Sequence, residues 1–511
     1  MLSQNRVFTP LAFLLIGVLL RCVAINQPLI DAHLYRQCQT ADAVRSLLDA
    51  PGWELSARVS WLGDTNSRLV QEFPLYNYLV AGVYRFVGNL DASGKITSIL
   101  LWVASFVCLQ QLWRRLLTST QAAWANFLFV VSPLSIFFGQ AFMPEMLIRL
   151  CEFGFLAALL AYAERGCTSH FLIATAAGVI GMVVKAPEFA HLYLVAGVIV
   201  FQKEGWSALR RPRYWLMLIG TAACVKGWAH FVDVTNAANF PEWTATASAG
   251  SFLGGWRERL SFHPYIKYAG YLAAFALTPA GLLVAVFGGL RVARDAERRL
   301  VLAAWALAVG AFYLMWGPRT AGEHSYYHLP ALGMACALFG IGADRLRKVV
   351  AASPRGSRAV TVALAILVIV PAAGGTCYLF RQDRTIYDAA IWVRDHVPRN
   401  EMVLYDLNHR MELDYAHVTT FSYYAGRPVW VYSRAMTPER RRRALATSAW
   451  AVVTWPPKQE TGLDSLRRLL RGGDKPLQPD DESWLENEAG FTRYLETPEF
   501  TVYRKATQSN G

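Results

Sequence analysis

The sequence predicts a mainly α-helical, polytopic membrane protein that ends in an extracytoplasmic α/β domain. Hydrophobic residues make up 54% of the 511 positions and charged residues only 17%, whereas a soluble domain has roughly 25% charged residues. Apolar runs of about 16–20 residues recur, close to the roughly 20 residues that an α-helix needs to cross a bilayer. The formal net charge of +13 is therefore assigned to loops between spans rather than to a nucleic-acid partner.

Eleven apolar segments have the length and composition of membrane spans. They cover residues 7–25, 96–113, 119–138, 146–163, 171–186, 188–202, 214–230, 268–289, 300–316, 329–344 and 359–380. The first segment follows Arg6 and has no clear small-x-small cleavage site after it, so we predict an uncleaved span rather than a signal peptide. Pro187 separates two short segments, which indicates broken or tilted helices.

Basic residues are concentrated in alternate loops, and this pattern predicts the orientation. With the amino terminus inside, the inner loops carry Arg114-Arg115, Arg210-Arg211 and the basic residues of 345–348, while the outer loops hold fewer Arg and Lys residues for their length. Positive charge is retained on the cytoplasmic side. We therefore expect a multi-pass protein of the cytoplasmic (inner) membrane with a cytoplasmic amino terminus and an outer carboxyl-terminal domain.

Two domains are expected, a membrane domain over residues 1–380 and a soluble extracytoplasmic domain over 381–511. Within the first outer loop, 26–95, the segment 73–86 is too short to span and is predicted as an amphipathic helix at the membrane interface. After residue 380 we predict helices at 384–397, 437–447 and 460–471 and strands at 401–405, 449–455 and 500–503. About 130 residues are enough for an α/β domain.

The eight cysteines form no Cys-x-x-Cys pair, and most lie in or beside apolar runs. This spacing argues against a disulfide framework or a zinc-thiolate site. We interpret them as buried thiols that behave like small hydrophobic side chains.

The segment Asp31-Ala32-His33-Leu34-Tyr35-Arg36-Gln37 begins where the first span ends. Such a cluster of polar side chains is costly beside lipid unless it finds partners or serves chemistry. Asp31 has a simple interpretation as a helix cap or surface acid. The alternative is a general base that accepts the proton of a substrate hydroxyl, which is typically worth about 10²–10⁴-fold in rate.

Two further charged residues fall on the predicted outer side. Glu145, in Met143-Pro144-Glu145, either ends a helix at the interface or is a second carboxylate that supports Asp31. Lys185 either extends to the interface or pairs with a phosphate. Arg36 and Arg319 are other phosphate candidates, because guanidinium groups bind phosphate through paired donors. Cations of this kind suit a leaving group on which negative charge develops.

Histidines and another acid provide a candidate metal site. His324 and His328 are spaced i, i+4, which puts both on one face if the segment is helical. Together with Glu72 they are candidate ligands of a divalent ion. The simpler alternative is that these histidines and Tyr327 are interfacial residues. The sequence therefore does not decide between a divalent-ion site and an interfacial group.

Taken together, these motifs resemble the GT-C class of membrane glycosyltransferases, in the branch that contains protein O-mannosyltransferases and the lipid A aminoarabinose transferase. The resemblance covers roughly residues 7–380. It is carried by the following motifs in chain order: Asp31 with Arg36-Gln37, Glu72-Phe73-Pro74, Met143-Pro144-Glu145, Lys185-Ala186-Pro187 and the His324–Pro330 element.

The resemblance implies a GT-C-like helical bundle and an inverting transferase. Such an enzyme moves a sugar from a polyprenyl-phosphate donor to a hydroxyl of a glycan, lipid or protein acceptor, at the outer face of the membrane. It implies Asp31 as the base and Glu145 as a supporting acid, with Tyr35, Arg36, Glu72, Lys185, Arg319, His324 and Tyr327 near the substrates. The sugar and the acceptor stay open.

This sequence departs from its relatives at three positions. Ala32 stands where many have a second acid, Phe73 where some have a lysine, and Glu145 where aspartate is common. Phosphate binding by that lysine is therefore not carried over. The alternative function is a transporter or flippase of lipid-linked saccharides, which would normally show charged or broken helices near the midplane and internal repeats.

Overall fold

The computed structural model describes residues 5–253, 255–294, 299–320, 324–350, 353–382, 384–406, 415–432, 437–454, 485–486 and 489–505. The chain forms two compact units. The helical unit comprises Met1–Gln27 and Val70–Phe380, and the sheet unit comprises Pro28–Leu69 and Arg381–Gly511. The sequence-based domain boundary at residue 380 put the whole first outer loop, 26–95, in the membrane domain. In the structure, residues 28–69 of that loop belong to the sheet unit.

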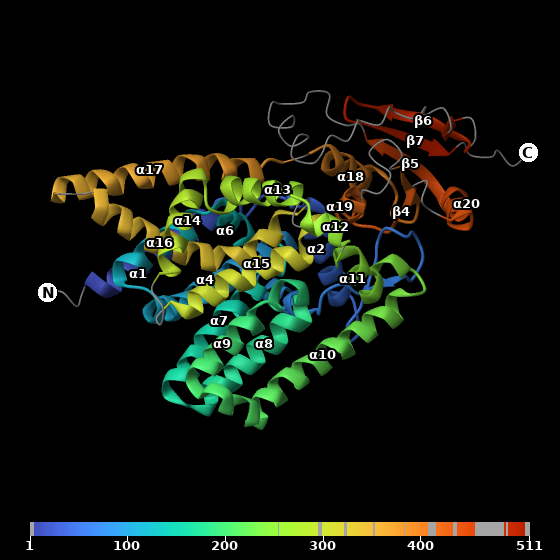
Figure 1. The fold of residues 1–511 in the computed structure, drawn as a ribbon. Helices are drawn as coiled ribbons and strands as arrows, with labels where there is room; N and C mark the ends of the chain where they lie inside the picture. The colour runs from blue at the N-terminus through green and yellow to red at the C-terminus, as the bar shows by residue number, and fades with distance from the viewer. Residues whose placement is uncertain are drawn as a thin grey trace, which may run out of the picture. The chain divides into compact units, whose positions relative to one another are not determined.

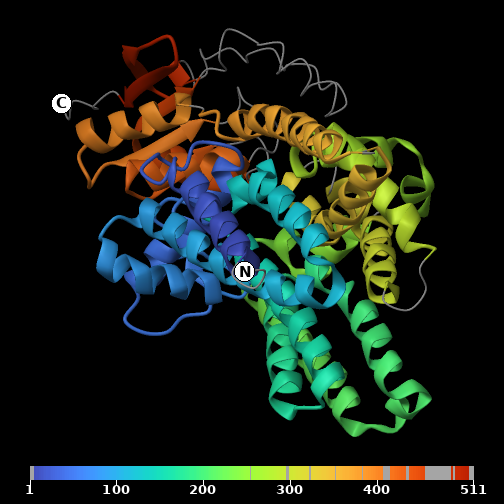
Figure 2. The ribbon, with the colours of Figure 1, turned by 90° about the vertical axis from the view of Figure 1, so that its left-hand side faces the viewer.

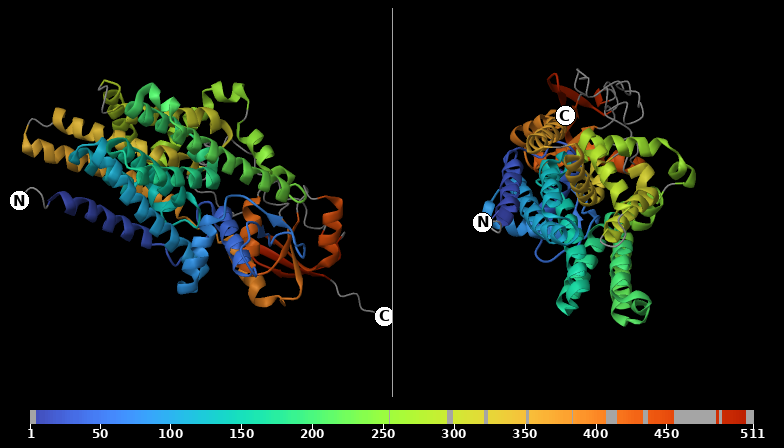
Figure 3. Two further views of the ribbon diagram at one scale, coloured as in Figure 1. Left: turned by 90° about the horizontal axis from the view of Figure 1, so that it is seen from below. Right: turned by 60° about the vertical axis from the view of Figure 1, so that its left-hand side comes forward.

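The helical unit is built from long helices that run roughly parallel or antiparallel to one another (Figure 3, left). Its first half contains α1 (Asn5–Cys22), α3 (Leu75–Val87), α4 (Leu90–Leu116), α5 (Ser119–Val131), α6 (Pro133–Phe138), α7 (Glu145–Arg165), α8 (Thr168–Phe189) and α9 (Leu192–Glu204). Its second half contains α10 (Pro212–Asn236), α11 (Ala245–Leu253), α12 (Trp256–Leu260), α13 (His263–Tyr271), α14 (Pro279–Val292), α15 (Leu300–Thr320), α16 (Leu329–Val350) and α17 (Pro354–Leu379). Short η1 (Gly205–Arg210), η2 (Pro241–Trp243), η3 (Leu272–Ala276) and η4 (Ser325–His328) join some of them (Figure 1).

Every predicted span coincides with a helix or a helix pair. Within the described ranges, six helices are long and apolar enough to cross a membrane, or seven if the bent pair 263–292 counts as one span. Helices α7, α8 and α9 lie side by side, as Figure 2 shows. The expected interfacial helix is α3, which is only 13 residues long.

The predicted span at 268–289 falls on two helices with a sharp bend between them. The helices on either side of Leu277 and Thr278 are bent by 111°. Thr278 has a left-handed φ of 67°, and its hydroxyl accepts a hydrogen bond from the backbone nitrogen of Gly281. Pro279 then starts α14, where its missing N–H costs nothing. The Thr278-Pro279 pair therefore ends one helix and begins another inside a single apolar run.

Two other predicted spans are also interrupted. Pro133 divides the 119–138 segment into α5 and α6. In α8 the break falls at Lys185, whose φ of −157° and ψ of 76° are not helical, two residues before Pro187. A proline removes a backbone donor and disfavours helical geometry before it. The predicted broken helix is thus confirmed.

The sheet unit contains a five-stranded mixed sheet with strand order β4-β3-β5-β7-β6. The strands are β3 (Met402–Asp406), β4 (Val429–Tyr432), β5 (Ser448–Thr454), β6 (Phe491–Glu496) and β7 (Phe500–Lys505). Strand β3 pairs in parallel with β4 and β5, whereas β7 is antiparallel to β5 and β6. Helices α18 (Thr385–His396), α19 (Tyr415–Ala425) and α20 (Pro438–Thr447) accompany the sheet (Figure 1).

The α/β prediction is confirmed, although it missed part of the sheet. Strands β4 and β6 and helix α19 were not predicted, while β3, β5, β7, α18 and α20 lie where the sequence indicated. The predicted helix at 460–471 lies outside the described residues. Trp430, Phe491 and Tyr503 are the large side chains of the buried core of this unit.

The first-loop segment of the sheet unit pairs with the edge strand β4. It contains α2 (Leu34–Leu48) and the short antiparallel strands β1 (Ala57–Arg58) and β2 (Arg68–Leu69). The backbone nitrogens of Val429 and Val431 donate to the carbonyl oxygens of Ser60 and Trp61, and Gly63 donates to Val429. Because an open sheet edge attracts other strands, this segment both covers the edge and ties α2 to the sheet.

Candidate active site

The helical unit contains a buried ion pair between two of the predicted residues. Glu145 begins α7 directly after Pro144 and is fully buried. The Nζ atom of Lys185 donates to Oε1 of Glu145 at 2.8 Å and lies 2.6 Å from Oε1 of Glu188. The break in α8 places Lys185 at this point. One cation whose side chain is 10% exposed is therefore held between two buried carboxylates, which is the pairing that burial of a charge requires.

The pair continues into a longer network of buried charges. Arg149 donates to Oε2 of Glu188 at 3.0 Å and is also paired with Glu152, and all three side chains are buried. Along α7, residues 145, 149 and 152 are spaced i, i+4 and i+7 and share one face. The network has three acids and two bases, so it carries one net negative charge when all five groups are ionised.

One oxygen of Glu145, the buried Oε2 atom, has no hydrogen-bond partner among the described residues. The side-chain amide of Gln140, four residues before Pro144, is likewise buried without a partner among the described residues. Buried polar atoms are normally hydrogen-bonded, so both side chains depart from the usual pattern.

Aromatic residues surround Lys185. Its Nζ atom lies 4.1 Å from the ring centroid of Tyr326 and 5.2 Å from that of Tyr327. His324 stacks on Tyr326, with ring centroids 5.1 Å apart and planes 8° from parallel. These cation–π contacts bring η4 and the loop before it against α8. The predicted residues Lys185, His324 and Tyr327 therefore meet in one part of the helical unit.

Glu72 and α3 lie beside this group. Glu72 is within electrostatic range of Lys185. Tyr76, the second residue of α3, is buried and hydrogen-bonded to the carbonyl oxygen of Gly94 at 3.1 Å and to the hydroxyl of Ser98 at 2.9 Å. These bonds fix α3 to α4. Arg319 lies in α15, and its side chain is outside the described residues.

The sheet unit holds the other predicted group, around Asp31. Asp31 is buried, and its Oδ1 atom accepts a hydrogen bond from the side-chain nitrogen of Gln37 at 2.5 Å. The same nitrogen donates to the carbonyl oxygen of Ala32 at 3.0 Å. His33 has a left-handed φ of 57° and precedes the first residue of α2. The tight turn at 31–33 and the first turns of α2 thus hold the Asp31 carboxylate in one orientation.

Neighbouring residues of α2 are also held in place. The guanidinium of Arg36 is largely buried and donates to Oε1 of Gln39 at 2.7 Å, while Tyr35 is half-buried. The backbone nitrogen of Leu29 donates to the hydroxyl of Tyr424 at 2.5 Å. Helix α19 of the carboxyl-terminal region therefore restrains the loop that carries Asp31.

The metal prediction has no support in the geometry and stays a prediction. Across the described residues, no group of three His, Cys, Asp or Glu side chains is placed to hold a metal ion. The imidazole of His328 is instead hydrogen-bonded to the hydroxyl of Tyr313 through Nδ1 at 2.9 Å. Glu72 and His324 remain the candidate ligands.

Sequence reasoning missed four polar residues of this site. They are Gln140, Arg149, Glu152 and Glu188. The last three are buried within the helical unit. The i, i+4, i+7 spacing of charges in an otherwise apolar run was the signal available, since buried charges in spans normally pair with one another.

A family model supports the predicted resemblance. The model described as dolichyl-phosphate-mannose-protein mannosyltransferase matches residues 71–229. This segment includes Glu72, Glu145 and Lys185. Comparison with curated proteins gives no match.

Solved structures share the fold over nearly the whole chain. ArnT from Cupriavidus metallidurans bound to undecaprenyl phosphate is 15% identical with a TM-score of 0.62, and the match covers 99% of each chain. The same protein in the apo state is 14% identical with a TM-score of 0.64, over 96% of this chain and 97% of that one. The archaeal oligosaccharyltransferase AglB from Archaeoglobus fulgidus, in complex with an inhibitory peptide and a dolichol-phosphate, is 13% identical with a TM-score of 0.57, over 88% of this chain and 69% of that one.

Proposed function

We propose that this chain, which has the GT-C fold, is an inverting glycosyltransferase that takes a sugar from a polyprenyl-phosphate donor and transfers it to a hydroxyl acceptor. The observation that carries the proposal is the buried Glu145–Lys185 pair, which lies in the segment that the mannosyltransferase family model matches. Structures with this fold contain undecaprenyl phosphate or a dolichol-phosphate. Both ligands support a lipid-linked donor.

Asp31 is the proposed base. Its carboxylate removes the proton of the acceptor hydroxyl while that oxygen forms a bond to the anomeric carbon. The bond between the anomeric carbon and the phosphate oxygen breaks, and its electron pair leaves with the polyprenyl phosphate. Attack opposite the leaving group inverts the anomeric configuration. Gln37 positions the base, since its amide nitrogen donates to Oδ1 of Asp31.

Glu145 is the proposed supporting acid. Its Oε1 atom is bound to Lys185, whereas the buried Oε2 atom has no partner among the described residues. A carboxylate oxygen is an acceptor only. We therefore assign to Oε2 a hydrogen bond from a sugar hydroxyl, which would orient the sugar for attack.

Cationic side chains are proposed to stabilise the departing phosphate. Lys185, Arg36 and Arg319 are the candidates. Lys185 is already paired with Glu145 and Glu188. A phosphate would therefore compete with these carboxylates, and the guanidinium groups suit a phosphate through paired donors.

The sugar class and the orientation in the membrane are also part of the proposal. We infer a hexosyl- or pentosyltransferase in the cytoplasmic (inner) membrane, with the active side and the sheet unit outside. This orientation rests on the distribution of Arg and Lys between the loops. Acceptors are a glycan, a lipid or a protein, and a divalent metal stays optional.

The experiment is mass analysis of surface glycans and lipid A in cells with and without the protein. A sugar that is lost without the protein and restored by the wild type, but not by Asp31→Asn, supports the transferase. Loss of the same sugar with full restoration by Asp31→Asn would instead indicate a protein that moves lipid-linked saccharides without changing them.

A further inference from the structure

Helices α14 and α16 approach each other through glycines at one end of the helical unit. A β-carbon placed on Gly288 would lie 1.9 Å from the carbonyl oxygen of Leu338, and one on Gly342 would lie 2.1 Å from the carbonyl oxygen of Val284. No side chain fits at either position. The two backbones therefore touch at Gly288 and Gly342, as small residues allow in membrane helices.

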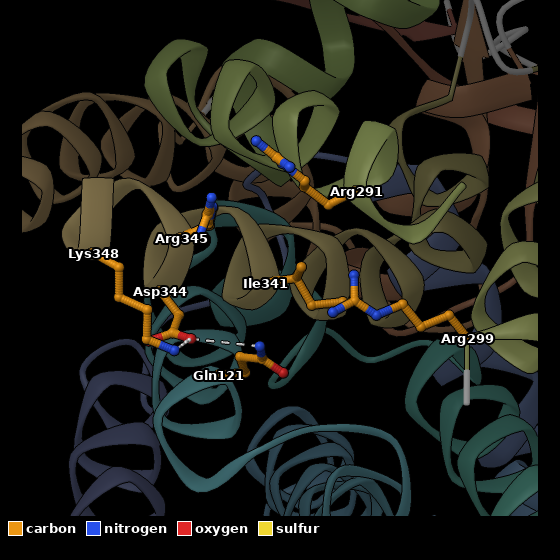
Figure 4. A pocket seen from close by; sticks show the side chains of 7 residues that line it. All are labelled: Gln121, Arg291, Arg299, Ile341, Asp344, Arg345 and Lys348. Carbon is orange, nitrogen blue, oxygen red and sulfur yellow. Dashed lines mark hydrogen bonds and ion pairs between the residues drawn. The ribbon is translucent and has the colours of Figure 1, made fainter. Parts of the chain in front are cut away.

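This contact brings two arginines together. Arg291 and Arg345 each follow one of the glycines by three residues, close to one helical turn. In Figure 4 their side chains project from neighbouring stretches of α14 and α16. Like charges held side by side repel each other. The glycine contact therefore fixes the two helix segments that carry these cations, and an anion in the pocket that both line would be stabilised by both.

The two arginines line a pocket of about 320 Å³. It is lined by Gln121, Arg291, Arg299, Ile341, Asp344, Arg345 and Lys348 (Figure 4). Four of these residues are basic and one is acidic. Asp344 is already bound by Lys348 at 2.7 Å and by Arg347 at 3.4 Å, so the lining keeps an excess of positive charge.

An apolar surface leads to this pocket. Leu283, Val286 and Leu290 are spaced i, i+3 and i+7 along α14, and their exposed fractions are 72%, 55% and 63%. They form one stripe that ends next to Arg291. An exposed apolar stripe on a membrane helix faces acyl chains, while basic pockets between membrane helices suit anionic head groups.

We propose that this pocket binds the head group of an anionic phospholipid with two phosphodiester charges, and that its acyl chains lie along the α14 stripe. The site is separate from Glu145 and Lys185, and the proposal does not depend on the transferase assignment. The stripe is the reason for choosing a lipid over a free phosphate compound, because a free anion would use the cations and leave the stripe unused.

The test is native mass spectrometry of the full-length protein after exchange into phosphatidylcholine with added cardiolipin. The variant is Arg291→Gln with Arg345→Gln. The control is Arg355→Gln with Arg358→Gln, which removes the same charge from exposed positions near the start of α17. We expect one retained cardiolipin in the wild type, roughly 30-fold weaker retention in the variant and about twofold or less change in the control.

Three results would overturn the proposal. Equal losses in the variant and the control would indicate general attraction to positive charge. Unchanged retention in the variant would place the lipid elsewhere. Displacement of cardiolipin by millimolar inorganic pyrophosphate would indicate a site for free phosphate compounds. Arg299→Gln, with an expected loss of about fivefold, provides a second variant if the double variant does not fold.

Discussion

The Nζ atom of Lys185 lies 2.8 Å from Oε1 of Glu145, although 40 residues separate them in the chain. The contact depends on two local features. Pro144 starts α7 with Glu145 at its first position, and the break in α8 places Lys185 opposite it. Because both groups are buried, neither is stable there without the other.

Replacing the cation is therefore expected to destabilise the helical unit. Lys185→Met removes the cation bound to the buried Glu145 and leaves Glu188 with Arg149, which costs about 3–5 kcal/mol. Thermal unfolding of the purified protein measures the loss. Adding Glu145→Gln to Lys185→Met should recover part of it, since the carboxylate that lost its cation is removed.

The matched control is Arg115→Gln. Arg115 is paired with Glu164, whose side chain is 50% exposed, so its loss is expected to cost about 1 kcal/mol or less. If Lys185→Met unfolds at the same temperature as Arg115→Gln, the buried pair does not have the stabilising role assigned to it.

The Oε2 atom of Glu145, which has no partner among the described residues, gives a prediction about substrate binding. Glu145→Gln keeps an acceptor for Lys185, replaces one oxygen by a donor and removes the charge. We expect kcat/KM for transfer to fall about tenfold to hundredfold, as for the loss of a hydrogen bond to a charged group. Steady-state transfer assays measure this, and thermal unfolding verifies that the variant is folded. Transfer at the wild-type rate would remove Glu145 from the site.

The helices were predictable from the sequence, whereas their interruptions were only partly so. Apolar runs mark spans because bilayer thickness sets their length. The bend at Thr278 was missed because it lies inside one apolar run, although a threonine followed by a proline is a helix-start signal. In the sheet unit, the short strand β4 was missed because its identity as a strand depends on pairing with β3 and with residues 60–63.

The site was predictable residue by residue but not as a network. Glu145 and Lys185 each carried a local motif. Their partners Arg149 and Glu188 had no motif, because only the packing of α7 against α8 brings them together. Likewise, nothing local in the sequence indicated that Asp31 and α2 belong to the same compact unit as α19.

Gly63 is expected to be required for the sheet unit. It has a left-handed φ of 60°, and a β-carbon there would lie 2.2 Å from the ring of Trp430. Gly63→Ala should therefore cost roughly 1–3 kcal/mol through backbone strain and overpacking, measured by thermal unfolding. Gly52→Ala is the control, because no atom lies within 4 Å of its added β-carbon. Equal stabilities of the two variants would contradict the close packing at Gly63.

Tyr424 is expected to act as a positioning residue. Its hydroxyl accepts the hydrogen bond from the backbone nitrogen of Leu29, two residues before Asp31. Tyr424→Phe should lower kcat about fivefold, from the loss of roughly 1 kcal/mol of restraint on the loop, with little change in KM for the donor. Steady-state kinetics separate the two parameters. A change in KM with no change in kcat would assign Tyr424 to binding instead.

The role of Asp31 tests the account most directly. The measurement is release of polyprenyl phosphate from a polyprenyl-phosphate sugar donor by the purified protein in the presence of acceptor, for the wild type and Asp31→Asn. Asparagine keeps the oxygen that Gln37 binds, so the folded state should persist. The account predicts a loss of about 10²–10⁴-fold in Asp31→Asn at an unchanged unfolding temperature. Equal release by the folded variant and the wild type would contradict it.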